Sequence, residues 1–496
     1  MSDEENIKKN NLSILGIIIV GLIIFLIIAI TIFKYSLNSM VNERLELIQA
    51  SGAPVSLNGL EKKYYAPIPD EENAALIYEE AFAEYKDVSD VYALYLKEEN
   101  AKGVSAEKRM FKNENDYDKS VLIAGLANDL CVGASLPKKV KYASELYIKA
   151  NKKTLELLRK ASEFSKCRFD LNFKKGFYMQ LMYLSPARNC AKLLALNMIV
   201  NAYNGNSDAV LKDFIVTLKL SSFTKEVPLL ISVIVGHSIS HLALDSLEIS
   251  FNKVKFTDLQ LRQIIILLQN DFTMYTHFNV IYGECILCNQ ILSSKECLST
   301  FFYISRYTFL NKLAVDVFCF TGLNVLCKLK LLEILDELLC ILNTNDSVFE
   351  KNKKLDILNK KIKSLPFICN SILPFDNIIS YTKYVSDSIA KLNTALLVLT
   401  IERYRLKYHR LPDNLRQLVP EFINKIPLDP FSGKPYIFRI GELKIPYRTD
   451  DNKILYKKKY GLTVYSIGED GIDDNGNKSP SSLRNGDIPF RVLKQK

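Results

Sequence analysis

"LLALNMIVNAYNGNSDAVLKDFIVTLKLSSFTKEV", residues 193–227, is the stretch of sequence that decides the fold of this chain. Its leucine, isoleucine and valine residues recur at intervals of about three and four, which is the period of a helix with a buried face. The letters "NGNS", at 204–207, interrupt this period and are typical of a turn. The stretch therefore predicts two helices joined by a tight turn.

The same helical period extends on both sides, from about residue 139 to about residue 370. Helix pairs are the unit of tetratricopeptide-like arrays, but without a strict period the sequence predicts an irregular all-helical domain of helical hairpins. After about residue 370 the pattern changes, and "YIFRI", "ILYKKKY" and "LTVYSI" alternate as strands do. The fold class is therefore mainly α, with a helix over 386–411 leading into a small antiparallel sheet.

Residues 12–33 carry no charge. At about 1.5 Å per residue they cross the roughly 30 Å hydrocarbon layer of a bilayer. A cleaved signal peptide would have a shorter apolar core and a cleavage site of small residues, which "KYSLNSMVN" does not offer. We predict an uncleaved single-pass anchor. The apolar stretches 227–244 and 313–327 contain polar or charged residues and are predicted to be buried helices instead.

Orientation follows from the short segment before the anchor. Basic residues on the two sides nearly balance, so the positive-inside rule gives little preference. A tail of residues 1–11 before a single span usually stays in the cytoplasm, and residues 35–496 are then extracytoplasmic. We expect the bacterial inner membrane to be the location of the protein.

The chain has 496 residues and a net charge of +10, but its charges are mixed along the sequence. No block of basic and aromatic residues indicates nucleic acid as a partner. "KNKKLDILNKKIKSL", 351–365, places an apolar face opposite lysines, which fits a solvated helix or a helix resting on an anionic bilayer. The ten cysteines lack the spacings of a disulfide scaffold, and most lie within apolar helical pattern.

Two short motifs have the spacing of metal or redox sites. "HSISH" places His237 and His241 one helical turn apart, with Asp245 a turn further. Its apolar flanks and the missing glutamate of a zinc protease favour hydrogen-bonded core histidines. "CILC", 285–288, has no second cysteine pair and no βαβ pattern around it, which favours two small core residues. The sequence contains no nucleophile elbow, P-loop or dinucleotide fingerprint.

"YSIGEDGIDDNGN", 465–477, concentrates four acidic residues in one glycine-punctuated stretch. Calcium takes six to eight oxygen ligands from carboxylates, amides and carbonyls, and glycines let the backbone wrap around the ion. "DDNGN", 473–477, supplies such oxygens but lacks the frame of an EF-hand. A solvated acidic turn is the alternative, since turns use the same residue types.

The segment "IAKLNTALLVLTIERYRLKYHRLPDNLRQLVPEFINKIPLDPFSGKPYIFR" resembles the globular part of the major pseudopilin of type II secretion systems. The shared elements run in the same order: a helix, "YHRLPDNLRQLV", "IPLDPFSGKPY", "YSIGEDG" and "NGDI". They cover roughly residues 389–490, and Phe431 stands where the family usually has tryptophan. The resemblance implies a small α+β module.

The family's calcium loop matches residues 466–471, and its closing motif matches 485–488. The resemblance therefore implies Asp470 and Asp487 as calcium ligands, and Asn485 replaces an expected acid. Together with the oxygens of the adjacent loop, the candidate metal ligands are Asp470, Asp473, Asp474, Asn475 and Asp487.

The anchor departs from the pseudopilin pattern, because it has no leader with a glycine cleavage site and no Phe-Thr-Leu-Ile-Glu-like start. About 350 residues also separate it from the module. Prepilin processing and assembly into a pilus therefore do not carry over. "PIPDEENAALIYEEAF", 67–82, resembles the start of large uncharacterised membrane-anchored proteins of planctomycete-type bacteria, which often end in this module.

The sequence thus predicts a cytoplasmic tail (1–11), a transmembrane anchor (12–33), a helical ectodomain (35–370) and a pseudopilin-like module (371–496). We expect a structural or interaction role in the envelope, with secretion or envelope proteins as partners. An extracytoplasmic enzyme with a pocket in the helical domain, using His237, His241 or a carboxylate pair, is one alternative. A tethered module that binds a glycan or peptide through its tyrosines is another. A polar pocket would favour the enzyme, and an exposed tyrosine-lined surface would favour binding.

Overall fold

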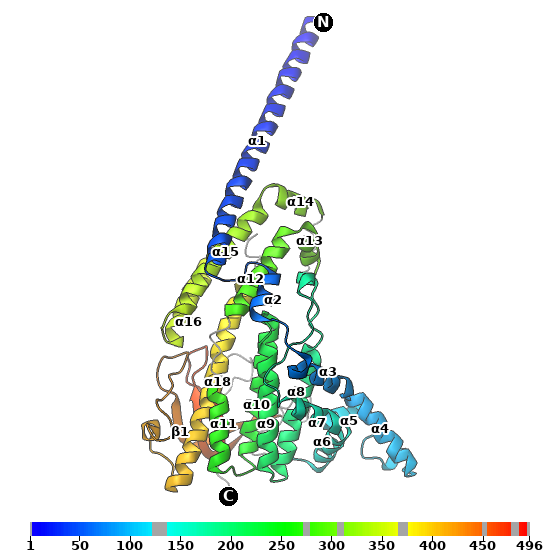
Figure 1. The fold of residues 1–496 in the computed structure, drawn as a ribbon, viewed down its shortest axis with the longest axis vertical. Helices are drawn as coiled ribbons and strands as arrows, with labels where there is room; N and C mark the ends of the chain where they lie inside the picture. The colour runs from blue at the N-terminus through cyan, green and yellow to red at the C-terminus, as the bar shows by residue number, and fades with distance from the viewer. Residues whose placement is uncertain are drawn as a thin grey trace.

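The computed structural model describes residues 2–121, 136–270, 278–304, 312–365, 375–448, 454–477 and 486–493. One long helix, α1 (Ser2–Ala50), projects from an elongated helical body, and a small sheet lies at the end of the body far from the start of α1 (Figure 1). The prediction of a mainly helical chain with an apolar N-terminal helix and a small antiparallel sheet is confirmed.

The first part of the body consists of short helices. They are α2 (Leu57–Tyr64), α3 (Ala74–Glu84), α4 (Val88–Ala101), α5 (Glu114–Ser120), α6 (Lys138–Ala150) and α7 (Lys152–Ala161), with 3-10 turns η1 (Asp70–Glu72), η2 (Ala106–Lys108) and η3 (Phe173–Tyr178). Local sequence sets where they begin. At the start of α4, for example, Asp87 accepts from the Asp90 amide at 2.9 Å, and the Asp90 side chain accepts from the Asp87 amide at 3.1 Å. This reciprocal cap satisfies two amides that the helix itself leaves unpaired.

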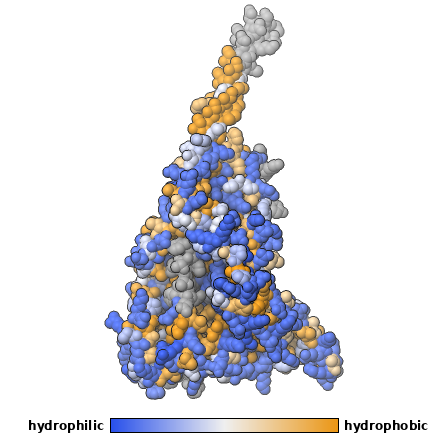
Figure 2. Space-filling model, viewed as in Figure 1, coloured by the Kyte–Doolittle hydropathy of each residue, from blue (hydrophilic) through white to orange (hydrophobic). Residues whose placement is uncertain are grey.

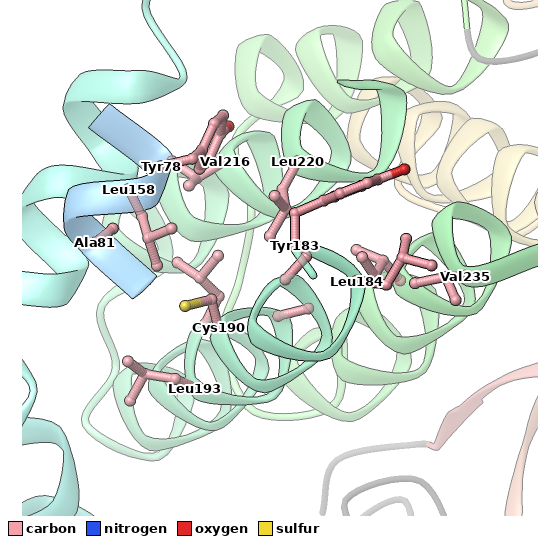
Figure 3. Packing of buried hydrophobic residues seen from close by; sticks show 14 of the residues in the cluster. Tyr78, Ala81, Leu158, Tyr183, Leu184, Cys190, Leu193, Val216, Leu220 and Val235 are labelled. Atoms are coloured by element: carbon pink, nitrogen blue, oxygen red, sulfur yellow. The ribbon is translucent and has the colours of Figure 1, made fainter. Parts of the chain in front are cut away.

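The stretch 193–227 forms the predicted helix pair. It belongs to α8 (Leu184–Tyr203) and α9 (Ser207–Lys225), and α10 (Leu230–Phe251) packs against both. The Asn206 side chain caps α9 by accepting from the Ala209 amide at 3.0 Å. Figure 3 shows apolar side chains of these helices meeting Tyr78 and Ala81 of α3 and Leu158 of α7. Fully burying a leucine in such a layer stabilises the fold by about 2 kcal/mol.

Helices α11 to α16 follow: α11 (Asp258–Asn270), α12 (Phe278–Ser293), α13 (Lys295–Ile304), α14 (Lys312–Phe320), α15 (Leu323–Asn343) and α16 (Val348–Lys363). Leu37, Val41 and Ile48 of α1 are buried together with side chains of α12, α14, α15 and α16, in what we call the stem core. The apolar face predicted within 351–365 is buried there too, through Leu355, Leu358 and Ile362. That helix therefore gives its apolar face to the protein and its lysines to solvent.

The C-terminal part contains α18 (Phe375–Tyr408), the 3-10 turn η5 (Leu415–Leu418), β1 (Ile437–Arg448), β2 (Ile454–Ser466) and β3 (Ile488–Leu493). The sheet is antiparallel in the order β1-β2-β3. β3 pairs only with residues 461–466 of β2. Residues 442–448 and 454–460 therefore extend beyond it as a two-stranded hairpin arm.

A shared core joins the sheet to the helical body. It contains Phe214 of α9, Leu247 of α10, Leu396 of α18, Val464 of β2 and Phe490 of β3. The predicted domain boundary between residues 370 and 371 lies outside the described residues, as do Cys131, His277, Cys369 and Asn485. Separate folding of the two predicted domains stays a prediction, which must be tested against this common core.

The second long apolar helix is part of the body. By length and composition, only α10 resembles a membrane span besides α1 among the described residues, and 67% of its apolar window is buried. The prediction that 227–244 forms a buried helix is therefore confirmed.

Candidate functional site

The candidate site is the acidic loop, residues 466–477, between the end of β2 and the start of β3. Ser466 fixes its beginning: its hydroxyl donates to Asp429 Oδ1 at 2.7 Å and accepts from the Gly468 amide at 3.1 Å. Gly468 has a φ of 69°, and a Cβ there would lie 2.3 Å from the carbonyl oxygen of Gly486. Only glycine fits this close approach, which brings the two ends of the loop together.

Asp470 and Asp473 shape the turns of the loop. Asp470 accepts from the Ile472 amide at 3.1 Å through Oδ1 and from the Gly486 amide at 2.8 Å through Oδ2. Asp473 Oδ1 accepts from the Asn475 amide at 2.8 Å and from the Tyr465 hydroxyl at 3.0 Å. Side-chain to backbone bonds of this kind are how aspartate builds turns. Three of these four carboxylate oxygens are thus engaged in holding the loop.

Asp487 is the buried acid of the site, with 2% of its surface exposed. Its Oδ2 accepts from the Gly476 amide at 2.6 Å, but its buried Oδ1 has no donor in hydrogen-bond geometry among the described residues. Burial raises the pKa of Asp487 to about 6, and the Asp473 and Asp474 carboxylates add to this rise against the lowering effect of backbone N–H groups. A buried oxygen without a hydrogen-bond partner destabilises the folded state, so a cation bound at this atom would stabilise it.

The structure brings some of the predicted ligands together and turns others away. Asp473 and Asp474 lie close enough to Asp487 to raise its pKa. Of the predicted ligands, Asn475 is turned away, since its Oδ1 accepts from Arg439 of β1. Glu469, an acid of the loop that was not a predicted ligand, pairs with Lys383 of α18 at 2.6 Å. In the described part of the chain, no cluster of three or more histidine, cysteine, aspartate or glutamate side chains has the arrangement of a metal site.

The residue types nevertheless fit calcium. This ion binds carboxylates and completes its six to eight ligands with backbone carbonyls, amide oxygens and water. The loop offers all three kinds of protein oxygen, and Asp487 Oδ1 is a buried carboxylate oxygen with no donor in hydrogen-bond geometry among the described residues.

The histidine pair does not form a site. His241 Nε2 lies 2.7 Å from the Ser388 hydroxyl of α18, and Asp245 pairs with Lys391 of the same helix at 2.7 Å. The His237 ring lies among aromatic rings, 6.4 Å from Tyr381 between centroids. For His241, the predicted hydrogen bond is confirmed, but the residue is only half-buried and does not belong to the core.

The cysteine pair lies in the stem core. Cys285 and Cys288 are both buried, and burial raises the pKa of each thiol well above its usual range. Thiols of this kind are unreactive. A small cavity beside them has an apolar lining, formed by Cys285, Ile334, Leu335, Leu338, Leu358, Ile362 and Ile379. It offers no convergent acids to an enzyme.

Sequence reasoning missed a buried ion pair that positions the site. Arg491 of β3 donates from Nε to Glu248 Oε1 of α10 at 2.9 Å, and its amide donates to the same oxygen at 3.0 Å. Asn252 adds a bond at 2.9 Å from its side chain to the Arg491 carbonyl. These contacts fix β3, and with it Asp487 just before the strand. The available signal was Glu248 and Asn252, which stand one turn apart at the end of a helix that is mostly buried.

Comparison with known proteins gives no match, whether to a protein-family model, a curated protein or a solved structure. The resemblance to pseudopilins therefore rests on the motifs quoted above.

Proposed function

We propose that this chain is a membrane-anchored envelope protein with a structural or interaction role, which holds its sheet at a fixed place relative to the bilayer. The observation that carries the proposal is the continuity of anchor and body. From residue 14 onward α1 contains an exposed, strongly apolar stretch, with a mean hydropathy of 3.3, and its second half enters the stem core. Figure 2 shows this apolar helix emerging from a largely hydrophilic body.

The junction is rigid because α1 does not break where it leaves the apolar stretch. Leu37 and Val41 are buried, and Arg44 pairs with Asp336 of α15 at 2.6 Å. A continuous helix has a fixed rise of about 1.5 Å per residue, so the length of the connection between anchor and body is fixed. A tethered enzyme needs only a flexible linker, whereas a protein that positions a partner benefits from a stiff connection.

The location follows from the same helix. We expect the inner membrane, with residues 1–11 in the cytoplasm and the body on the other side. The full chain should stay in the membrane fraction after an alkaline wash and keep its N-terminus. Protease added to spheroplasts should digest the body. A soluble product that starts near residue 40 would contradict the anchor.

The hairpin arm is the surface through which we expect envelope or secretion proteins to bind. Tyr456 and Tyr460 are 41% and 57% exposed, and they share one face of β2 with Lys458. Tyrosine is one of the residue types that are enriched at protein interfaces.

In-cell photo-crosslinking tests this role. A photoreactive phenylalanine at Tyr460 should give a discrete protein adduct. The matched control is Leu259 of α11, which is 67% exposed and outside the arm. No adduct from Tyr460 and Tyr456, in cells where the protein is folded and in the membrane, would contradict an interaction through the arm.

The same tyrosines favour a second candidate, a tethered module that binds an extracytoplasmic glycan or peptide. Aromatic faces suit both ligands, since they offer large apolar area with a polar edge. Retention of the full chain on purified cell-wall glycan, lost in the Tyr456→Ala and Tyr460→Ala variants, would select this candidate. An extracytoplasmic enzyme is the third hypothesis, and the apolar lining of the cavity in the stem core does not support it.

We propose calcium as the ion of the acidic loop. Asp487 and Asp473 would supply carboxylate oxygens from two sides, with Asp470, Asp474 and Asn475 or their carbonyls completing the set. The ion would supply positive charge to a loop whose acids repel one another. What supports this proposal is the unpartnered, buried Oδ1 of Asp487.

The pseudopilin identity of the C-terminal module is likewise a proposal. Its support is the order of the quoted motifs. They fall on α18, on η5, on the turn around Asp429, on the end of β2 and, for residues 486–488, at the start of β3. The turn contacts the end of β2 directly, since Asp429 accepts from the Ser466 hydroxyl at 2.7 Å. Such a module would link the protein to secretion.

A further inference from the structure

Helix α14 lies where the apolar part of α1 ends. Lys34 is the first charged residue after the apolar stretch, and its Nζ donates to the Cys319 carbonyl at the end of α14 at 3.0 Å. Gly322, at the corner between α14 and α15, approaches Lys34 so closely that a Cβ would lie 3.4 Å from the Lys34 Cβ. This corner therefore lies beside α1 at the end of its apolar stretch, at the top of the body in Figure 1.

α14 has one buried face and one exposed apolar face. Val315, Phe318 and Cys319 pack into the stem core. Val317 and Phe320 are 51% and 54% exposed. Residues three apart lie on the same side of a helix, so these two side chains form one apolar surface. It faces away from the stem core, beside the end of the apolar stretch of α1.

Positive charge lies at the end of α14, around Cys319. The ammonium groups of Lys295, Lys34 and Lys328 all lie close enough to Cys319 to lower the pKa of its thiol, although burial dominates and raises it. Lys295 pairs with Asp316 of α14 at 2.6 Å. Burial lowers the pKa of Lys328, and the neighbouring Lys34 adds to that effect. Three lysines with one nearby carboxylate leave a net positive patch beside an apolar one.

We propose that α14 is a second membrane contact, in which Val317 and Phe320 enter the interfacial layer of the bilayer and Lys34 and Lys328 bind the phosphates of anionic lipids. A helix at the membrane interface places apolar side chains at the boundary of the acyl chains and basic side chains at the anionic headgroups. The occupant is a bilayer because the surface continues directly from the apolar exterior of α1. With two contacts, the body cannot swivel about α1. The inference rests on α1 as an anchor, and not on calcium or on a protein partner.

The test uses the absence of tryptophan from the chain. Phe320→Trp introduces a single fluorescent reporter at an exposed position, in the full-length protein reconstituted into phosphatidylethanolamine and phosphatidylglycerol vesicles. Bromine atoms on the lipid acyl chains should quench this tryptophan several-fold more than one at Ile357. Ile357 lies on α16 and is 68% exposed. It lies away from α14, because Lys354, one turn before Ile357, pairs with Asp346 after the C-terminal end of α15, whereas α14 meets the N-terminal end of α15.

Equal quenching at the two positions would overturn the proposal, as would quenching of Phe320→Trp by aqueous acrylamide as strong as that at Ile357→Trp. The lysines are tested by combining Phe320→Trp with Lys34→Gln and Lys328→Gln. Their loss should reduce quenching by brominated lipid in anionic vesicles but not in phosphatidylcholine vesicles. Unchanged quenching in anionic vesicles would refute the role of the lysines as phosphate ligands.

Discussion

Two buried carboxylates at the join of the body and the sheet differ in their surroundings. Glu248 of α10 is 4% exposed and faces the Arg491 guanidinium at 2.9 Å. Asp487, before β3, is 2% exposed, and the charged groups that act on it are the carboxylates of Asp473 and Asp474. The first acid has its cation within the chain. The second lacks one among the described residues. The first is therefore a structural contact, and the second is the carboxylate that we propose as a ligand.

Removing the cation from the first carboxylate should have the largest effect. Arg491→Met leaves Glu248 buried and unpaired, which costs about 3–5 kcal/mol because the charge has lost its partner. Thermal melting of the full chain in detergent should show this loss. The double variant Glu248→Leu with Arg491→Met should recover most of it. Lys458→Gln, which breaks the exposed pair between Lys458 and Glu442, should leave the melting temperature unchanged. A double variant as unstable as the single one would contradict the pairing.

The second carboxylate should show itself in the pH dependence of stability. Its pKa rises from 3.8 to about 6 on folding, so the folded state binds the proton more tightly. The resulting stabilisation is complete below about pH 4 and is lost as the pH rises through about 6, a change of about 3 kcal/mol. Melting in the presence of chelator measures it. Asp487→Asn should remove this component, and a variant with the pH dependence of the unmodified chain would contradict an unpaired Asp487.

Bound calcium should give Asp487 a cationic partner, as Arg491 does for Glu248. At a calcium concentration a hundred times the dissociation constant, the folded chain gains about 2.7 kcal/mol. Asp487→Asn and Asp473→Asn should abolish the gain. Glu469→Gln is the matched control, since it removes the same charge from the loop but its carboxylate pairs with Lys383. Equal melting temperatures with calcium and with chelator would return the loop to a solvated turn. Loss of the gain in the control would mean that only net charge matters.

The hydrogen bond between His241 of α10 and Ser388 of α18 should contribute least to stability. Ser388→Ala removes the partner of His241 between α18 and α10, a bond of 2.7 Å. Neutral hydrogen bonds contribute about 1 kcal/mol each. The variant should therefore melt only slightly below the unmodified chain and keep the calcium effect in full. A loss as large as that of Arg491→Met would show that this seam, and not the ion pair, holds the body to the sheet.

Local pattern was enough to predict the parts of the fold that local forces dictate. The period of 193–227 gave two helices because each buries one stripe, and the uncharged run of 12–33 gave an apolar helix because no residue in it requires water. The acids of 469–474 were visible as a group because they are adjacent in sequence. That Glu469 and the neighbouring Asn475 would bind residues outside the loop was not visible, since their partners Lys383 and Arg439 come from distant elements.

The sequence by itself determined that the chain is mainly helical, that an apolar helix leads it, that a small antiparallel sheet follows the last long helix, and that this sheet carries an acidic loop. Only the tertiary structure decided that α1 continues into the stem core and that Val317 and Phe320 are exposed on the helix beside it. It also decided that Glu248 pairs with Arg491, 243 residues further along the sequence. The physical reason is range. Periodicity and turn chemistry act within a few residues, whereas the burial of a charge depends on what the folded chain places beside it.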